Sequence, residues 1–168
     1  MEDLEITPMR AGDLQALARI LAESDVWKRK RRGYGGAVHF FKTHDPSFGE
    51  IHVARLGDKI AGLIWFSVRN TFYEFGYIRL VAVAPDCYGQ GIGTKLMAFA
   101  EEKIGREVRA VFLLVSDFNT GARRLYERLG YSPCGVLANY KGEANDEIIM
   151  CKADWEMPDN FDGVRLSL

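Results

Sequence analysis

Hydrophobic residues recur along this chain with two different periods, and each period predicts a different kind of element. Residues 51–56 and 59–68 are short apolar runs typical of strands, and Gly57-Asp58 lies between them. That dipeptide is a strong turn signal, so the two runs predict a β-hairpin. Residues 75–84 form a longer strand-like run that stops at Pro85, because proline has no main-chain N–H to donate.

Three other segments show the period of an α-helix. In residues 12–24, four apolar residues between Leu14 and Leu21 fall at helical spacing and give the segment one apolar face. The two others are residues 93–104 and residues 120–130, and Gly130 is the expected C-terminal glycine of the second.

The remaining pattern completes a mixed sheet. Residues 108–115 are apolar on both faces, as in a buried strand, and residues 132–140 and 145–153 predict a closing strand pair. The basic, glycine-rich residues 26–36 are expected to form a loop or short irregular helix, followed by a brief helical turn at residues 39–44. Strands joined first by hairpins and then through crossover helices give an α/β fold, with helices on the faces of the sheet.

Composition and charge narrow the classes of protein. A chain of 168 residues with a net charge of −1 fits one domain and has no global field that would favour nucleic acid or a membrane. The first ten residues do not resemble a signal peptide, and no apolar run is long enough to span a bilayer. We expect one domain over residues 1–153 and a polar tail over residues 154–168.

The three cysteines, Cys87, Cys134 and Cys151, are far apart in the sequence and include no C-x-x-C pair. That spacing argues against a disulfide framework or a zinc site and favours a reduced, cytoplasmic setting. The three histidines, at positions 39, 44 and 52, also lack the spacing of metal ligands, so we expect no metal.

Three glycines, Gly89, Gly91 and Gly93, lie two residues apart where a strand gives way to a helix. Such glycines let the chain bend and let an anion approach main-chain N–H groups that have no partner within the helix. The pattern predicts a phosphate site, with a tight turn that holds no ligand as the alternative. The dinucleotide fingerprint and the P-loop both require a different glycine spacing.

The glycine loop and a second motif together carry a family resemblance. Residues 88–93, YGQGIG, follow the strand end VAVAP and precede TKLM, and residues 119–131 read NTGARRLYERLGY. With the closing segment VLANYKGEANDEIIMCK, they resemble the GNAT superfamily of acetyl-CoA-dependent N-acetyltransferases. The resemblance implies a single-domain, mostly antiparallel sheet of six to seven strands flanked by helices. The family's usual Arg or Gln at the first loop position is Tyr88 here.

The resemblance also implies where acetyl-CoA would bind. The pyrophosphate would rest on the glycine loop, and the pantetheine arm would pair with the preceding strand, where a main-chain N–H near Val83 would polarise the thioester carbonyl. Asn119 resembles the family's coenzyme-contacting asparagine, although it is equally suited to cap the helix that follows. The implied coenzyme-binding residues are Val81, Ala82, Val83, Tyr88, Gly89, Gln90, Gly91, Ile92, Gly93, Thr94, Asn119, Ala122 and Tyr126.

Two catalytic roles follow from the same resemblance. Tyr126 matches the tyrosine that protonates the leaving thiolate, and packing within the apolar face of its helix is the alternative. The acceptor must attack as a neutral amine, so a base would help. In the family, the base is often a glutamate from the strand before the glycine loop, and Glu74 is the nearest carboxylate to that strand here. The alternative is that Glu74 is a solvated turn residue. Tyr77 could instead join a water chain that takes up the proton.

The basic run Lys28 to Arg32 has three interpretations. It could be a nuclear signal or nucleic-acid patch, or simply a solvated loop face. In the third, the run joins Trp27 and Tyr34 in shaping the acceptor cleft for an acidic or aromatic acceptor.

The sequence therefore predicts an N-acetyltransferase that moves an acetyl group from acetyl-CoA to a primary amine. Direct attack in a ternary complex is expected, because no cysteine has the setting of a nucleophile. The acceptor is a small molecule or a protein N-terminus, without nucleic acid or membrane, and a homodimer is left open. The alternative function is a CoA-binding sensor or interaction module without catalysis.

Overall fold

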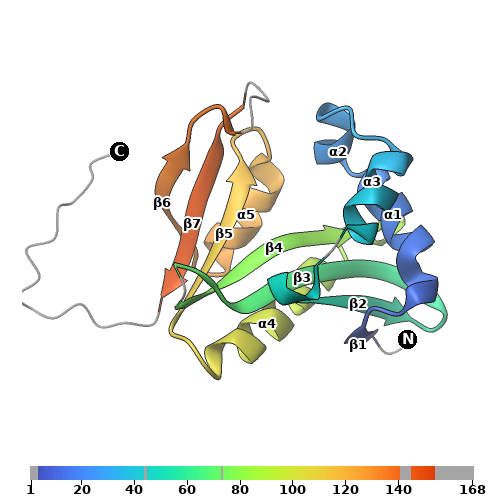
Figure 1. The fold of residues 1–168 in the computed structure, drawn as a ribbon, viewed down its shortest axis with the longest axis horizontal. Helices are drawn as coiled ribbons and strands as arrows, with labels where there is room; N and C mark the ends of the chain where they lie inside the picture. Colours follow the sequence, from blue (N-terminus) through green and yellow to red (C-terminus); the bar gives the residue numbers. More distant parts are fainter. Residues whose placement is uncertain (1–3, 44, 73, 141–144, 154–168) are drawn as a thin grey trace, which may run out of the picture.

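The computed structural model describes residues 4–43, 45–72, 74–140 and 145–153 (Figure 1). Its centre is a seven-stranded sheet in the order β1-β2-β3-β4-β5-β7-β6. Neighbouring strands are antiparallel except for β4 and β5, which are parallel. The strands are β1 (Leu4–Pro8), β2 (Glu50–Leu56), β3 (Lys59–Thr71), β4 (Phe75–Val83), β5 (Ala110–Ser116), β6 (Ser132–Leu137) and β7 (Glu147–Ala153).

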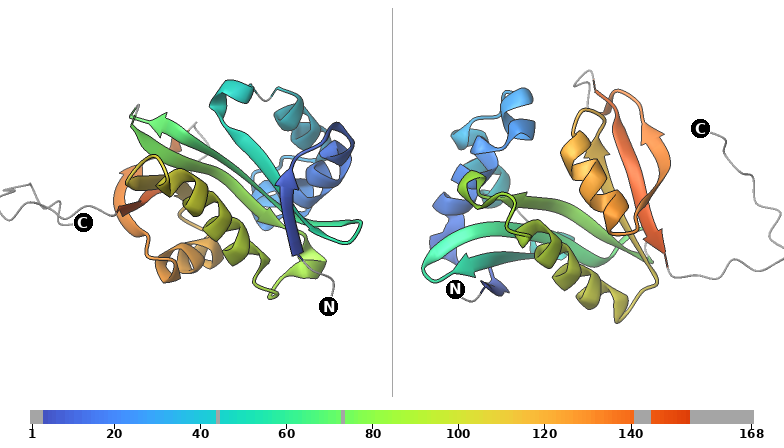
Figure 2. Two further views of the ribbon diagram at one scale, coloured as in Figure 1. Left: turned by 90° about the horizontal axis from the view of Figure 1, so that it is seen from below. Right: turned by 180° about the vertical axis from the view of Figure 1, so that it is seen from behind.

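Five α-helices cover the two faces of this sheet. Helices α1, α2 and α3 lie on one face, and α4 and α5 lie on the other (Figure 2). Because α4 connects the parallel pair β4–β5, and α5 connects β5 to β6, both crossovers bring their helix to the same face. The helices are α1 (Leu14–Glu23), α2 (Asp25–Arg29), α3 (Tyr34–Lys42), α4 (Ile92–Gly105) and α5 (Thr120–Arg128).

A two-sided core explains why the apolar periods in the sequence become these elements. On one side, Leu17 and Leu21 of α1 are almost fully buried, and on the other, Leu96 and Met97 of α4 are fully buried. Between them, β3 contributes apolar residues to both faces, which is why its sequence is a continuous apolar run rather than an alternating one.

Most of the predicted elements are confirmed. The hairpin β2–β3 turns at Gly57, which has a φ of 53°, and Gly130 follows α5 with a φ of 91°. Both angles lie in the left-handed region that favours glycine. The two crossover helices and the closing strand pair also form where the sequence predicts them. The proposed tail, residues 154–168, lies outside the described residues.

Two segments differ from expectation. Residues 26–36, expected to form a loop or short irregular helix, include most of the short helix α2, but Tyr34 to Gly36 are already the first turn of the longer helix α3, which continues to Lys42. The helix forms because Ala37 and Phe41 are buried against the core, and this packing outweighs the poor helix propensity of the glycines. The sequence placed no strand at Leu4–Pro8, yet this segment is the edge strand β1, where Pro8 is tolerated at the end of the strand.

In the described part of the chain, no helix is both long and apolar enough to cross a membrane.

His52 on β2 gives the fold a pH dependence. Its ring is 4% exposed and packs between Phe66 and Phe99, with ring-centre distances of 5.7 Å and 4.8 Å. Burial, with the nearby charge of Lys103, lowers the pKa of His52 below its ordinary value of 6.5, and Glu50 opposes the shift. The folded state therefore favours the neutral ring.

We expect the free energy of unfolding to be insensitive to His52 above pH 6.5 and to fall as the pH drops through its lowered pKa. His52→Phe should remove part of the loss, because no charge then has to be buried. Urea unfolding of both proteins at neutral and acidic pH measures this difference. His39→Gln, at an exposed histidine of α3, is the control, and an equally steep loss in His52→Phe would contradict the prediction.

Candidate active site

The parallel strands β4 and β5 pair over only three positions and then separate. Their register runs from Gly76↔Val111 to Ile78↔Leu113, whereas β4 continues to Val83 with β3 as its partner on the other edge. Figure 1 shows the two strands diverging beyond this point. The later half of β4 therefore presents a main-chain edge toward β5 that is not paired by the sheet.

A β-bulge in β4 lies at the same level. Trp65 of β3 pairs with Leu80 and Phe66 pairs with Ile78, so Arg79 is the extra residue of the bulge. A bulge bends its strand and increases the local twist. It therefore explains why β4 turns away from β5 directly after Ile78.

The open edge of β4 offers main-chain donors. Ala84 N–H donates to the carbonyl of Ala61 on β3, at 2.8 Å. Because successive N–H groups of a strand point to opposite edges, those of Val83 and Val81 point toward the open edge. An extended ligand can pair with such an edge as an added strand.

The glycine loop directly follows this strand. A short 3-10 turn, Pro85–Cys87, leads into the loop, in which Gly89 has a φ of 77° and Gly91, the N-cap of α4, has a φ of 74°. These left-handed conformations, rather than lack of space, require the glycines, because an added Cβ would meet nothing within 4 Å at either position.

The loop leaves a set of donors without acceptors. Within the described residues, no group accepts a hydrogen bond from the main-chain N–H groups of residues 89–94, and no side chain caps α4. The N-terminus of this 14-residue helix also carries a partial positive charge. The loop and the helix terminus together are suited to bind a phosphate or pyrophosphate.

A cavity of about 300 Å³ opens at this loop. It is enclosed from the other side by α5, through Leu125 and the exposed, cationic Arg128. Sequence reasoning missed Arg128, although its i, i+3 spacing from Leu125 places both on one helix face. The lining residues are Val83, Cys87, Tyr88, Gly89, Gly91, Ile92, Gly93, Thr94, Leu125 and Arg128.

Tyr126 of α5 is a buried tyrosine that keeps its proton. It is 7% exposed and contacts the ring of Tyr131 edge-on, at a ring-centre distance of 6.0 Å. Burial, with a smaller effect of Tyr77, raises the pKa of Tyr126 well above its usual value of 10.0. Burial also raises the pKa of Tyr77 on β4 to about 12. Tyr126 therefore remains a hydroxyl donor at neutral pH.

Asn119 has the capping role that was its alternative interpretation. It is the N-cap of α5, and its Oδ1 accepts a hydrogen bond from Ala122 N–H at 3.2 Å. The cap places Asn119 and Ala122 at the N-terminal end of α5, and their contacts with a coenzyme stay a prediction.

Glu74 is not brought to this site. It is exposed in the turn between β3 and β4, where its N–H donates to Thr71. The glycine loop follows the other end of β4, roughly 25 Å away at the rise of an extended strand. The position of Glu74 therefore fits the alternative interpretation, a solvated turn residue, and does not fit a catalytic base.

The basic run is largely exposed, as in the solvated-face interpretation, but part of it is helical and two of its residues make specific contacts. Lys28 and Arg29 end α2, and the guanidinium of Arg29 lies 4.1 Å from the ring centre of Phe118. Lys30 Nζ lies 2.9 Å from Oε1 of Glu147 on β7. These contacts join α2 to the half of the sheet beyond the β4–β5 separation.

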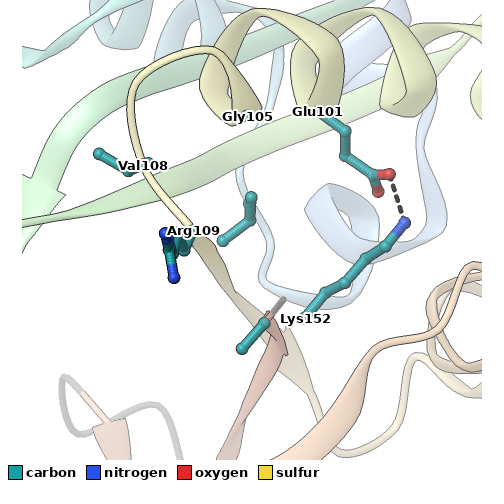
Figure 3. Close-up of a pocket in the computed structure, with 7 residues that line it drawn as sticks. Glu101, Gly105, Val108, Arg109 and Lys152 are labelled. Atoms are coloured by element: carbon teal, nitrogen blue, oxygen red, sulfur yellow. Dashed lines mark hydrogen bonds and ion pairs between the residues drawn. The ribbon is translucent and has the colours of Figure 1, made fainter. Parts of the chain in front are cut away.

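A larger groove of about 1050 Å³ lies elsewhere, where α4 ends, β5 begins and β7 ends (Figure 3). Its most polar feature is an ion pair of 2.6 Å between Lys152 and Glu101. The groove includes neither the glycine loop nor the open edge of β4, so its size alone does not make it the active site.

A mixed sheet with an open strand edge beside a glycine-rich helix N-terminus defines the class of acyl-CoA-binding folds. The family profile described as "Acetyltransferase (GNAT) family" matches residues 14–131, and the chain belongs to this family. Family members use acetyl-CoA as co-substrate.

Individual relatives agree with this assignment. An uncharacterized N-acetyltransferase of Methanocaldococcus jannaschii is 31% identical over 60% of this chain, and the match spans 64% of that protein. The N-terminal acetyltransferase B complex catalytic subunit NAA20 of Arabidopsis thaliana is 31% identical over 68% of this chain and 74% of its own length. A GNAT family acetyltransferase from Elizabethkingia anophelis, solved with acetyl-CoA bound, has the same fold with a TM-score of 0.71 and 19% identity, covering 91% of this chain and 99% of that one.

Substitution of Gly91 tests the phosphate site. Gly91→Ala forces a side chain into a left-handed conformation, so we expect a loss of about 1–2 kcal/mol in stability and a weaker affinity for coenzyme A. Gly105→Ala, in the last turn of the same helix, is the matched control, because Gly105 lacks a positive φ and an added Cβ would meet nothing within 4 Å. Thermal unfolding and calorimetric titration measure both effects, and equal behaviour of the two variants would contradict this assignment.

Arg128 should contribute charge to the same site. We expect Arg128→Gln to lower the affinity for coenzyme A about ten-fold, since a hydrogen bond to a charged group contributes roughly 1.5–3 kcal/mol. The affinity of the variant should also depend less on salt. Arg124→Gln, an exposed arginine of the same helix that does not line the cavity, is the control. Calorimetric titrations at low and high salt measure the difference, and an unchanged affinity in Arg128→Gln would exclude the contact.

Proposed function

We propose that this protein transfers the acetyl group of acetyl-CoA to a primary amine by direct attack in a ternary complex. The observation that carries the proposal is the continuity of two sets of main-chain donors. The unpartnered N–H groups of residues 89–94 lie directly after the open edge of β4. The N–H groups of the glycine loop fit a pyrophosphate, and the open edge of β4 fits the amide groups of a pantetheine arm.

The open edge also supports a role in the chemical step. The N–H of Val83 or Val81 would donate to the thioester oxygen as negative charge develops on it, which stabilises the transition state more than the ground state. No rearrangement is required, because the strand already fixes these donors.

Tyr126 is proposed as the proton donor. When the amine nitrogen bonds to the thioester carbon and the carbon–sulfur bond breaks, the leaving thiolate needs a proton. Burial keeps the Tyr126 hydroxyl protonated, and α5 also contributes Leu125 and Arg128 to the cavity at the glycine loop. Cys87 lines the same cavity but is only 2% exposed, which favours direct attack over an acetylated cysteine.

The acceptor is proposed to be an amine of a small molecule or of a protein N-terminus. The name of the plant relative, a catalytic subunit of an N-terminal acetyltransferase, favours the second. The decisive experiment mixes the protein with acetyl-CoA and panels of amines and N-terminal peptides, and detects free thiol and the mass of the product. Coenzyme A binding without product in any panel would instead favour a non-catalytic CoA-binding module.

Tyr126→Phe tests the proton donor. We expect turnover to fall about a hundred-fold, which is typical for loss of a general acid, with little change in the affinity for coenzyme A. Tyr131→Phe is the matched control, because it also removes a buried hydroxyl and its ring contacts that of Tyr126. Steady-state kinetics and calorimetry separate the two effects. Parallel losses of turnover and coenzyme affinity in Tyr126→Phe would show that the tyrosine acts only by packing.

A further inference from the structure

Glu147, at the start of β7, is a buried carboxylate with one oxygen fully engaged and the other not. The residue is 6% exposed. Its Oε1 accepts hydrogen bonds from Lys30 Nζ at 2.9 Å, Ser116 Oγ at 2.7 Å and Asn145 Nδ2 at 3.3 Å. Its Oε2 has no hydrogen-bond partner among the residues that the structure describes.

The three donors hold this carboxylate in one orientation. They come from three separate parts of the chain: the turn after α2, the end of β5 and the segment before β7. A carboxylate fixed in this way by its neighbours is preorganised for a ligand. Because all three donors bind Oε1, Oε2 keeps its capacity to accept, and a hydrogen bond from a charged donor outside the chain would be stabilising there.

Glu147 lies on the face of the sheet opposite the glycine loop. It pairs directly with Ser116 of β5, so both side chains are on one face, which Phe112 shares because side chains alternate along a strand. Tyr77 of β4 is in register with Phe112 and has the same orientation. Arg79 lies on this face as well, 5.7 Å from the ring centre of Phe40 in α3, so this is the face on which helices α1 to α3 lie (Figure 2).

This placement puts the carboxylate beside the gap between β4 and β5. Ser116 is the last residue of β5, and its carbonyl accepts from Asn119 N–H at 2.8 Å, which joins it to the cap of α5. Tyr77 interacts electrostatically with Glu147 on its own face and with Tyr126, which belongs to α5 on the other face. The Ser116 pairing thus places Glu147 at the end of β5 from which the chain enters α5, the helix that carries the proposed proton donor.

We propose that Oε2 of Glu147 binds the primary ammonium group of the acceptor. The inference rests on the proposed function and assigns the acceptor side of that site. The preferred acceptors are then alkylammonium groups, including a peptide N-terminus, whose N–H groups can donate to Oε2 while Lys30 donates to Oε1.

The proton balance follows from this position. The ammonium gives one proton to Oε2, and from there to water, before its nitrogen attacks the thioester carbon. As the carbon–nitrogen bond forms and the carbon–sulfur bond breaks, the thiolate takes a proton from Tyr126, which regains one from the nitrogen. One proton is released per acetyl group transferred.

The kinetic test is Glu147→Gln, assayed with the amine that gives most product in the panel. A glutamine oxygen still accepts from Lys30 and Ser116, but its NH₂ group takes the place of Oε2 and donates instead of accepting. We expect the KM for the amine to rise about ten-fold or more, with the KM for acetyl-CoA unchanged. Ser116→Ala, which removes one orienting donor, should give a smaller rise in the same direction.

Glu101→Gln is the matched control, since Glu101 is the ion-paired glutamate of the groove in Figure 3 and is remote from the glycine loop. It should leave the KM for the amine unchanged. If Glu147 serves only to hold α2 against β7, Glu147→Gln should instead lower the melting temperature and raise the KM values for the amine and for acetyl-CoA equally. That result would overturn the inference.

A binding test that needs no turnover separates this inference from the proposed function. Methylammonium chloride is titrated into protein labelled with ¹³C at the glutamate carboxylates, and tetramethylammonium chloride, which has no N–H to donate, is the control. We expect a saturable shift of the Glu147 resonance with methylammonium alone. Its absence would overturn the inference even for an active acetyltransferase, whereas its presence without acetylated product would support the ammonium site and count against the proposed function.

Discussion

The separation of β4 from β5 after Ile78 is the constraint on which the rest of the site depends. Main-chain groups of a strand must be paired by another strand, by water or by a ligand. The bulge at Arg79 bends β4 away and leaves its second half with one paired edge and one open edge. If the pairing of the two strands continued to Val83, the sheet would be more regular and would offer no main-chain donors to a coenzyme.

The glycine loop extends this arrangement with a second set of unpaired donors. The left-handed conformations of Gly89 and Gly91 aim the chain into α4 without a capping side chain, so the helix N-terminus stays open. Glycine in such positions lowers the stability of the free protein, and hydrogen bonds to a charged phosphate offset that cost when the ligand binds. The proposed site would bind through the backbone, so the replacement of the family's usual Arg or Gln by Tyr88 leaves its main-chain donors in place.

The groups of the proposed site lie on both faces of the sheet. Helices α4 and α5 bring the glycine loop, Arg128 and Tyr126 to one face, and Glu147 lies on the other with Tyr77 and Lys30. Because the strands part between these groups, the proposed mechanism has the coenzyme and the acceptor approach from opposite sides of the sheet, without competing for the same contacts. The ion pair of Lys30 and Glu147 also connects the otherwise exposed basic run to β7, on the side where the acceptor is proposed to bind.

The sequence by itself determined the features that arise from neighbouring residues. Apolar periods predicted the hairpin, the crossover helices and the closing strand pair, and the glycine spacing predicted the open turn before α4, because these features depend on local conformational preference. Only the tertiary structure decided that β1 pairs with β2 and that Tyr34 to Gly36 are helical. It also decided that Arg128 lies at the cavity and that Glu74 lies far from it. The bond between Lys30 and Glu147 joins residues 117 positions apart, and no local pattern records such a contact. Contacts of that kind exist only once the sheet order and its bulge have brought distant segments together.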